Sequence, residues 1–190
     1  NFKGVGSDVD INDKFLLVSQ HPVTTEYGVN RENINHTLEA LNQLKMPTIM
    51  LWPNADAGGD FIAKKIRTLR EEKFFETPVR FFKNLPVDIY IKLMNQCSAL
   101  IGNSSSGIRE GAFIGTPCIN FGSRQANRDR AKNVIDIDKY SDNEFQKALE
   151  KHLHHGKYQS SAIYGEGNTA ERILEILKGK KPKIQKIFFE

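Results

Sequence analysis

Cysteine is scarce in this sequence, and long apolar runs are missing from it. Cys97 and Cys118 are the only cysteines among 190 residues, and their spacing fits neither a zinc site nor a disulfide framework. We expect two reduced core cysteines in a cytoplasmic protein. No apolar run approaches the ~20 residues of a membrane span, and the first residues lack the apolar core of a signal peptide. These absences predict a protein that does not associate with membranes.

A nucleic-acid motif and a set of metal ligands are also missing. The net charge of +4 owes much to the lysine-rich stretch at 178–186, which no basic stripe with interleaved aromatic residues accompanies. We expect a solvated tail and no nucleic-acid partner. His152, His154 and His155 cluster without a cysteine or carboxylate at ligand spacing. The sequence therefore predicts solvated surface histidines, no metal and no cofactor.

Short apolar runs alternate with helical patterns along the chain. Runs of this length between helices predict βαβ units, and so an α/β fold: a Rossmann-like three-layer domain with a parallel sheet. We expect this domain at 14–178, a lead-in at 1–13 and a basic tail at 179–190, with Asn30 as a helix N-cap. Strands are expected at 14–20, 47–52, 78–82, 99–102, 118–121 and 133–137, and helices at 30–44, 59–72, 87–97, 106–115, 142–153 and 168–178.

The stretch "GNSSSG" at 102–107 follows a predicted strand and opens a predicted helix. In open α/β sheets, ligands bind beyond the carboxyl ends of the strands. The first turn of a helix has unpaired N–H groups that favour anions, and serine hydroxyls add neutral donors. A serine N-cap accounts for one serine but not for three between two glycines. The pattern predicts a phosphate or diphosphate site, and it is not a Walker A loop because no Gly-Lys-Ser/Thr follows.

Polar residues also follow the other predicted strands, and each of them has two possible roles, one structural and one at a ligand. His21 precedes a proline that keeps it out of helical geometry, so it is either a hydrogen-bonded structural residue or a proton carrier. Arg124 is either a loop arginine or a counter-charge for a diphosphate. Glu110 is either a first-turn helix charge or the partner of a ribose diol. The loop at 53–59 is a capped turn or a second ligand-facing loop.

Four segments together resemble the non-phosphorylating UDP-N-acetylglucosamine 2-epimerase family, and most closely its hydrolysing branch. They are "QHPVTTE", "PNADAGG", "GNSSSGIREGAFIGTPCINFGSRQ" and "YGEGNTAERI", and they occur in the family's order. The resemblance implies the C-terminal half of a GT-B-type two-domain fold, a homodimer, and UDP or UDP-N-acetylglucosamine as ligand. The residues implied at the substrate are Leu85 at the uracil, Glu110 at the ribose, Ser104, Ser105, Gly107 and Arg124 around the diphosphate, and His21 as the catalytic group that assists departure of UDP.

The resemblance also implies a reaction. UDP is eliminated to give a 2-acetamidoglucal, and water or UDP then adds. The C2 proton would be handled by the N-terminal domain of the same enzyme, since this chain offers only His21 and Glu26 as candidate bases. We expect UDP binding without turnover from this chain alone. A reversible 2-epimerase, the donor half of a GT-B glycosyltransferase, a nucleotide-sugar binding module and a nucleic-acid-binding protein remain open alternatives.

Overall fold

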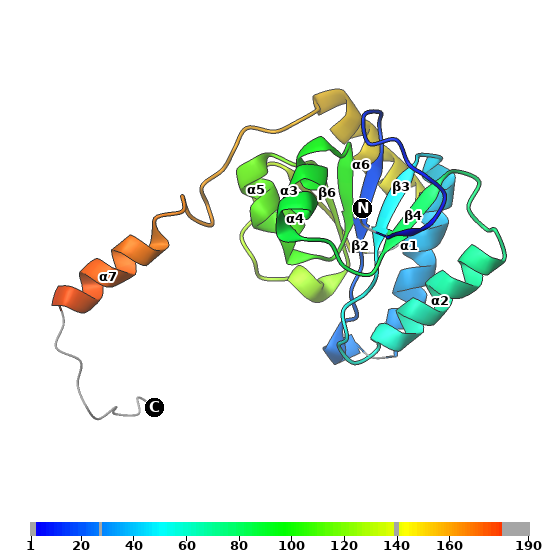
Figure 1. Ribbon diagram of the computed structural model, residues 1–190, viewed down its shortest axis with the longest axis horizontal. Helices are drawn as coiled ribbons and strands as arrows, with labels where there is room; N and C mark the ends of the chain where they lie inside the picture. Colours follow the sequence, from blue (N-terminus) through cyan, green and yellow to red (C-terminus); the bar gives the residue numbers. More distant parts are fainter. Residues whose placement is uncertain (1–2, 27, 139–140, 180–190) are drawn as a thin grey trace.

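A seven-stranded, mostly parallel sheet forms the centre of the computed structural model (Figure 1), which describes residues 3–26, 28–138 and 141–179. The strand order is β1-β4-β3-β2-β5-β6-β7, in which only β1 is antiparallel to its neighbour. Residues 5–6 of the expected lead-in thus form an edge strand. The strands are β1 (Val5–Gly6), β2 (Leu16–Ser19), β3 (Thr48–Leu51), β4 (Val79–Phe82), β5 (Ala99–Gly102), β6 (Cys118–Phe121) and β7 (Val134–Ile137).

Without the edge strand β1, the sheet has the strand order of a Rossmann fold. The chain runs outward from β2 through β3 to β4, then crosses over and continues outward on the other side from β5 to β7. The reversal lies between β2 and β5, which pair in parallel from Leu16↔Ala99 to Ser19↔Gly102. The carboxyl ends of β2 and β5 therefore lie side by side, at the switch point where such sheets bind ligands.

Helices cover both faces of the sheet, because successive strand residues point to opposite faces. Leu16 and Val18 pack with α1 (Asn30–Leu44), α2 (Gly59–Glu71) and α6 (Asp142–His155). Phe15 and Leu17 pack with α3 (Val87–Gln96) on the other face, where α4 (Ser105–Ile108) and α5 (Glu110–Ile114) also lie. Each fully buried side chain of this kind contributes ~1.5–3 kcal/mol. The predicted three-layer α/β fold is confirmed.

The N-cap prediction for Asn30 was wrong. Asn30 is the first residue of α1. The N-cap position is therefore Val29, whose side chain makes no capping hydrogen bond. The Asn30 amide instead accepts from the Val23 N–H (2.7 Å) and donates to the Val23 carbonyl (3.0 Å). Val23 is buried, so its backbone N–H and carbonyl need hydrogen-bond partners, and the Asn30 side chain supplies both.

The single helix predicted at 106–115 is two short helices. The break lies at Arg109, whose φ of −87° and ψ of −73° separate α4 from α5. The Gly107 carbonyl accepts a hydrogen bond from the Asn133 side chain (3.0 Å), and Gly115, at φ +80°, ends α5. Glu110 is therefore the first residue of α5 and carries the negative charge in its first turn.

The helix predicted at 168–178 is present as α7 (Thr169–Gly179), but it does not close the domain. Figure 1 shows it standing apart from the body of the molecule. Its apolar side chains are exposed: Ile173, Leu174, Ile176 and Leu177 are between 52% and 64% accessible. Of the basic tail expected at 179–190, Gly179 is the last residue of α7, and residues 180–190 lie outside the described residues. Within the described ranges, no helix has the length and apolar character needed to cross a bilayer.

Candidate functional site

The carboxyl ends of the central strands bring together residues from four loops. His21 follows β2, Asn54 follows β3, Asn103 follows β5 and Arg124 lies in the short helix η2 (Ser123–Gln125) after β6. The side chain of Asn103 joins the first and third loops, because its Oδ1 accepts from the His21 N–H and its Nδ2 donates to the His21 carbonyl, both at 2.8 Å. Asn103 is 1% exposed. This buried side chain therefore holds the loop after β2 against the loop after β5 at the switch point.

The backbone of Asn103 holds the next loop as well. Its carbonyl accepts from Arg124 Nη1 (3.2 Å) and from Gln125 Nε2 (2.8 Å). Arg130 braces the far end of this loop through an ion pair with Asp136 (3.0 Å). The Arg124 guanidinium is thus held over the segment that carries the serines, where a positive charge would face a bound anion.

The three serines form a cluster of hydroxyls at the start of α4. Ser104 and Ser106 share a hydrogen bond of 2.9 Å between their Oγ atoms, and the Ser104 Oγ caps α4 by accepting from the Ser106 N–H (3.4 Å). The Ser106 hydroxyl also bonds to the Tyr90 hydroxyl at 2.7 Å. All three serines remain partly exposed, so the cluster can present donors to a ligand.

The two glycines that flank the serines are required by packing. Gly102 has a φ of +132°, and a Cβ there would lie 2.3 Å from the Ser19 carbonyl oxygen, because β2 and β5 approach closely at this point. A Cβ on Gly107 would lie 2.5 Å from Cys118 Sγ. The Cα of Gly107 therefore packs directly against the core, with no room for a side chain. A contact of its backbone with UDP stays a prediction.

Burial keeps His21 uncharged at neutral pH. Burial is the main cause that lowers the pKa of His21 to about 4; the nearby Arg124 charge contributes in the same direction, and Asp56 acts in the opposite direction. Its Nδ1 accepts a hydrogen bond from the Asn54 N–H (3.3 Å), and its Nε2 bonds to Ser19 Oγ (3.1 Å). The ring is both hydrogen-bonded in the structure and placed at the ligand edge, so the two interpretations of His21 are compatible.

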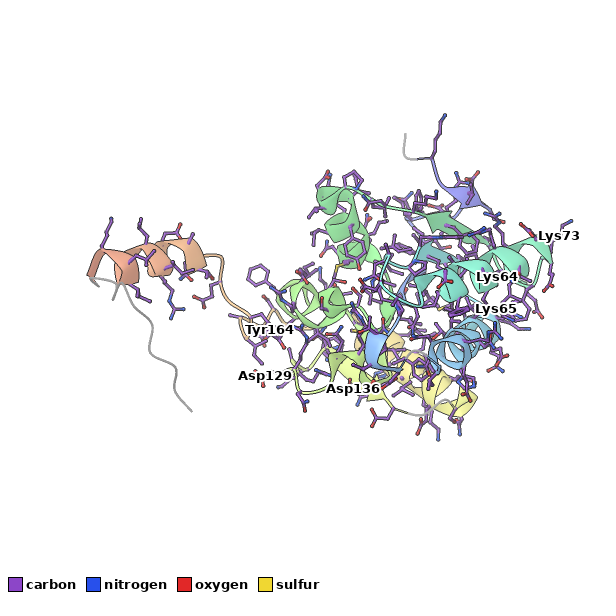
Figure 2. All side chains as sticks on the ribbon, turned by 90° about the horizontal axis from the view of Figure 1, so that it is seen from below. Lys64, Lys65, Lys73, Asp129, Asp136 and Tyr164 are labelled. Atoms are coloured by element: carbon purple, nitrogen blue, oxygen red, sulfur yellow. The ribbon has the colours of Figure 1, made fainter. Side chains whose placement is uncertain are left out.

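Glu110 and Leu85 do not join this constellation. Glu110 is exposed and lines a cavity of about 350 Å³ together with Ile91 and Tyr164. Figure 2 shows Tyr164 where the chain leaves the body toward α7, and its hydroxyl donates to the Asp129 carbonyl (2.7 Å). The Leu85 side chain is 8% exposed, and its N–H donates to Asn84 Oδ1 (2.9 Å). Their contacts with ribose and uracil stay predictions.

The expectation of solvated histidines was wrong for His152. This residue is 0% exposed; its Nε2 lies 3.1 Å from the Cys118 carbonyl, and its Nδ1 lies 3.1 Å from the Tyr158 hydroxyl. A carbonyl can only accept, so Nε2 donates and Nδ1 accepts from the tyrosine. The helical spacing of α6 turns His152 toward the sheet. Among the described residues, no three potential metal ligands come together, and Cys97 and Cys118 are free and buried.

Two residues at this site, Tyr90 and Asn103, were missed from the sequence, whereas Asn54 belongs to the loop at 53–59 that was offered as a second ligand-facing loop. The position of Asn103, between a strand-ending glycine and three serines, was the available signal, since asparagine can accept and donate at once. Tyr90 gave no signal because it lies inside a helix 14 residues before Ser104. Its hydrogen bond with Ser106 forms only because α3 packs against the sheet beside the start of α4.

The strand order and the donors gathered at the switch point define a Rossmann-type α/β domain with a polar ligand edge. Residues 3–178 match the sequence profile of the family described as UDP-N-acetylglucosamine 2-epimerase, and the chain belongs to this family. The chain is 34% identical over 170 residues to a hydrolysing UDP-N,N'-diacetylbacillosamine 2-epimerase of Legionella pneumophila, covering 89% of this chain and 44% of the relative.

Two further relatives support the family and the fold. A UDP-N-acetylglucosamine 2-epimerase of Neisseria meningitidis is 30% identical over 161 residues, covering 83% of this chain and 41% of its own length. The crystal structure of the Methanocaldococcus jannaschii UDP-GlcNAc 2-epimerase in complex with UDP-GlcNAc and UDP superposes with a TM-score of 0.66 at 17% identity, over 88% of this chain and 45% of that one. The chain thus spans less than half the length of these relatives, and its fold matches half of these GT-B-like structures.

Proposed function

We propose that this chain is the UDP-binding half of a UDP-N-acetylglucosamine 2-epimerase of the hydrolysing type. The whole reaction would convert UDP-N-acetylglucosamine and water to N-acetylmannosamine and UDP. Membership of the family supports the nucleotide-sugar chemistry, and the hydrolysing relative at 34% identity supports the branch. We also propose that the whole enzyme is a cytoplasmic homodimer, as the resemblance implies.

The observation that carries this proposal is the joining of His21, the serine cluster and Arg124 by Asn103. A diphosphate placed over the serines would receive hydroxyl hydrogen bonds from Ser104 and Ser105 and the charge of Arg124. Charge-assisted hydrogen bonds of this kind are about twice as strong as neutral ones. Leu85 would contact the uracil and Glu110 the ribose hydroxyls.

In the proposed mechanism, this half stabilises the leaving group. When the bond between C1 and the diphosphate oxygen breaks, negative charge develops on UDP, and fixed donors and a cation stabilise it without reorganising. Loss of the C2 proton completes the elimination to 2-acetamidoglucal. Water then adds its hydroxyl to C1 and a proton returns to C2, which gives N-acetylmannosamine. His21 lies near the diphosphate and supports departure of UDP.

The base that removes the C2 proton is proposed to come from an N-terminal half. Both ring nitrogens of His21 are engaged, by Asn54 and Ser19, and the Glu26 carboxylate accepts a hydrogen bond from the Ser123 hydroxyl. With the His21 ring engaged on both sides and one oxygen of Glu26 fixed by Ser123 next to the loop after β6, the described residues of this half offer no base with a clear path to a sugar carbon. The exposed apolar side chains of α7 also fit a second half, because burying them against another surface is favourable.

A reversible 2-epimerase is the second candidate. The relative from Neisseria meningitidis, which carries the name UDP-N-acetylglucosamine 2-epimerase without the hydrolysing designation, supports it. In that reaction UDP, rather than water, adds to the glycal, and UDP-N-acetylmannosamine is the product. The two reactions share the elimination step and the diphosphate site, so this half would serve both.

Calorimetric titration of the chain with UDP, UMP and ADP tests the binding proposal. We expect UDP to bind more tightly than UMP, because a second phosphate adds hydrogen bonds, and more tightly than ADP, because the base is read. A melting temperature raised by UDP would agree with this, since a ligand of the native state stabilises it. Equal binding of UDP and ADP, or no binding of UDP, would contradict the proposal.

A fusion tests the reaction. This chain is joined behind the N-terminal half of the Neisseria meningitidis UDP-N-acetylglucosamine 2-epimerase. The fusion is incubated with UDP-N-acetylglucosamine in D2O, with that relative at full length as the positive control for turnover of this substrate. We expect free N-acetylmannosamine carrying deuterium at C2, seen by NMR. UDP-N-acetylmannosamine as the product would favour the reversible epimerase, and sugar transferred to an added acceptor would favour a glycosyltransferase.

A further inference from the structure

The loop after β6 carries two arginines whose guanidinium groups have different surroundings. Arg124, near its start, donates to the Asn103 carbonyl at the ligand edge (3.2 Å). Arg130, near its end, instead pairs with Asp136 of β7. We infer that Arg130 is a positioning residue, which holds this loop so that Arg124 is fixed in place for the diphosphate. This inference rests on the proposed function and extends it to an arginine that does not itself meet the ligand.

The Arg130 guanidinium joins β7 to the backbone of the loop. Its Nε donates to Asp136 Oδ2 (3.0 Å) and its Nη2 to Asp136 Oδ1 (3.1 Å), so the ion pair is bidentate. Nη2 also donates to the Gln125 carbonyl (2.9 Å), and Nη1 donates to the Arg128 carbonyl (2.7 Å). A planar guanidinium offers these donors in a rigid fork. Arg130 therefore fixes how far the loop backbone lies from the strand.

Asp136 is a firm base for this arrangement because the neighbouring strand holds it. Its Oδ1 accepts a hydrogen bond from Asn120 Nδ2 (2.6 Å), and Asn120 is a 2% exposed residue of β6 that is paired in register with Asp136. An isolated surface ion pair contributes little, because its side chains move. Here the Arg130 and Asp136 side chains are only 24% and 37% accessible, and several hydrogen bonds fix both of them.

Gln125 transmits the constraint to Arg124, which directly precedes it in the chain. The Gln125 carbonyl is held by Arg130, and its side-chain Nε2 donates to the Asn103 carbonyl (2.8 Å). Gln125 is 2% exposed, so its side chain is anchored in the interior. The Arg124 side chain therefore starts from a fixed backbone, and a group held in its binding position loses less freedom when the ligand arrives.

The contacts of Arg130 favour this role over a direct contact with the ligand. Each nitrogen of its guanidinium already donates to an oxygen of the protein, and the Asp136 carboxylate balances its charge. Arg124, by contrast, has no carboxylate partner among the described residues. The unbalanced positive charge that would attract a diphosphate is thus that of Arg124.

Arg130→Met tests the inference, with Arg80→Met as the matched control. Arg80 also pairs with an aspartate, Asp8 (3.2 Å), and donates to a backbone carbonyl, that of Gly6 (2.9 Å), toward the opposite edge of the sheet. Its side chain is 27% accessible. We expect Arg130→Met to weaken UDP binding about tenfold in calorimetry, because part of the contribution of Arg124 is lost. Binding of uridine, followed by NMR titration, should not change, and the control should bind both ligands as the unmodified protein does.

A double-mutant cycle separates positioning from a general effect on structure or charge. In an Arg124→Ala background, Arg130→Met should weaken UDP binding less than about twofold, because no guanidinium is left to position. Arg130→Lys keeps the charge but cannot reach Asp136 and the Gln125 carbonyl together, so it should weaken UDP binding as Arg130→Met does. A tenfold loss in both backgrounds, full UDP affinity in Arg130→Lys, or an equal loss for uridine would overturn the inference.

Nitrogen NMR of the arginine side chains keeps the inference testable even if Arg130→Met does not fold. The Nε signal of Arg124 is identified by its loss in Arg124→Ala. We expect this signal to shift in Arg130→Lys and to stay in place in Arg80→Met. An unchanged Arg124 signal in Arg130→Lys would overturn the inference alone. Failure of the unmodified chain to bind UDP would overturn both this inference and the proposed function.

Discussion

Replacing Asn103 by alanine should destabilise the switch point strongly. The side chain is 1% exposed and makes two hydrogen bonds of 2.8 Å to the backbone of His21. Asn103→Ala leaves that N–H and that carbonyl without partners, and each unsatisfied buried group costs about 1–3 kcal/mol. Since His21 is partly accessible, water recovers part of the loss. We expect the free energy of unfolding to fall by about 2–4 kcal/mol.

The assay is thermal unfolding followed by circular dichroism. A loss of this size lowers the melting temperature by about 4–16 °C for a domain of this length. Asn42→Ala is the matched control, because its side chain accepts one hydrogen bond from the Glu76 N–H (2.9 Å) at an exposed position. The control should shift by no more than about 1 kcal/mol. If Asn103→Ala unfolded at the same temperature as the control, the bridging role assigned to Asn103 would be refuted.

Four other predictions address residues of the site. Arg124→Ala, and separately a Ser104→Ala/Ser105→Ala double variant, should weaken UDP binding by about 1–3 kcal/mol in calorimetry; unchanged affinity in either would remove those residues from the diphosphate site. The pKa of His21 is lowered to about 4, so the unfolded chain binds the proton more tightly, and stability should fall as pH drops from about 6.5 toward 4. His21→Gln should flatten that part of the melting-temperature profile, and a profile parallel to the unmodified protein's would contradict the burial argument. Gly107→Ala should destabilise by about 1–3 kcal/mol because its Cβ would meet Cys118 Sγ; adding Cys118→Ala should recover part of the loss in a melting experiment, and no recovery would show that the clash is not the cause.

The exposed face of α7 bears on how the whole enzyme is assembled. Four apolar side chains of this helix stand in solvent in the described structure, whereas the helices α1, α2 and α6 bury theirs against the sheet. The chain spans less than half of the length of its relatives. Under the proposed function, an N-terminal half that packs against α7 would bury these side chains.

The fold could be predicted from the sequence because local patterns control it. Apolar runs of strand length between amphipathic helices require a sheet covered on both faces, and six parallel strands were found where they were expected. His21, Ser104 and Arg124 could be proposed together for the same reason, since parallel strands present their carboxyl ends at one edge. The edge strand β1 was not predicted because two residues paired in isolation carry no periodicity.

The sequence by itself determined which residues end the strands, and therefore which chemistry meets at the ligand edge. Only the tertiary structure decided how those residues are held. The Asn30 side chain forms hydrogen bonds with the backbone of Val23 instead of capping α1. The helix after the serines is interrupted at Arg109, close to where the Asn133 side chain donates to the Gly107 carbonyl. His152 is buried. Asn103 and Tyr90 became visible only once β2, β5 and α3 were placed side by side. The physical reason is that a side-chain hydrogen bond across 82 residues, such as that between Asn103 and His21, depends on distance in space and leaves no periodic trace in the chain.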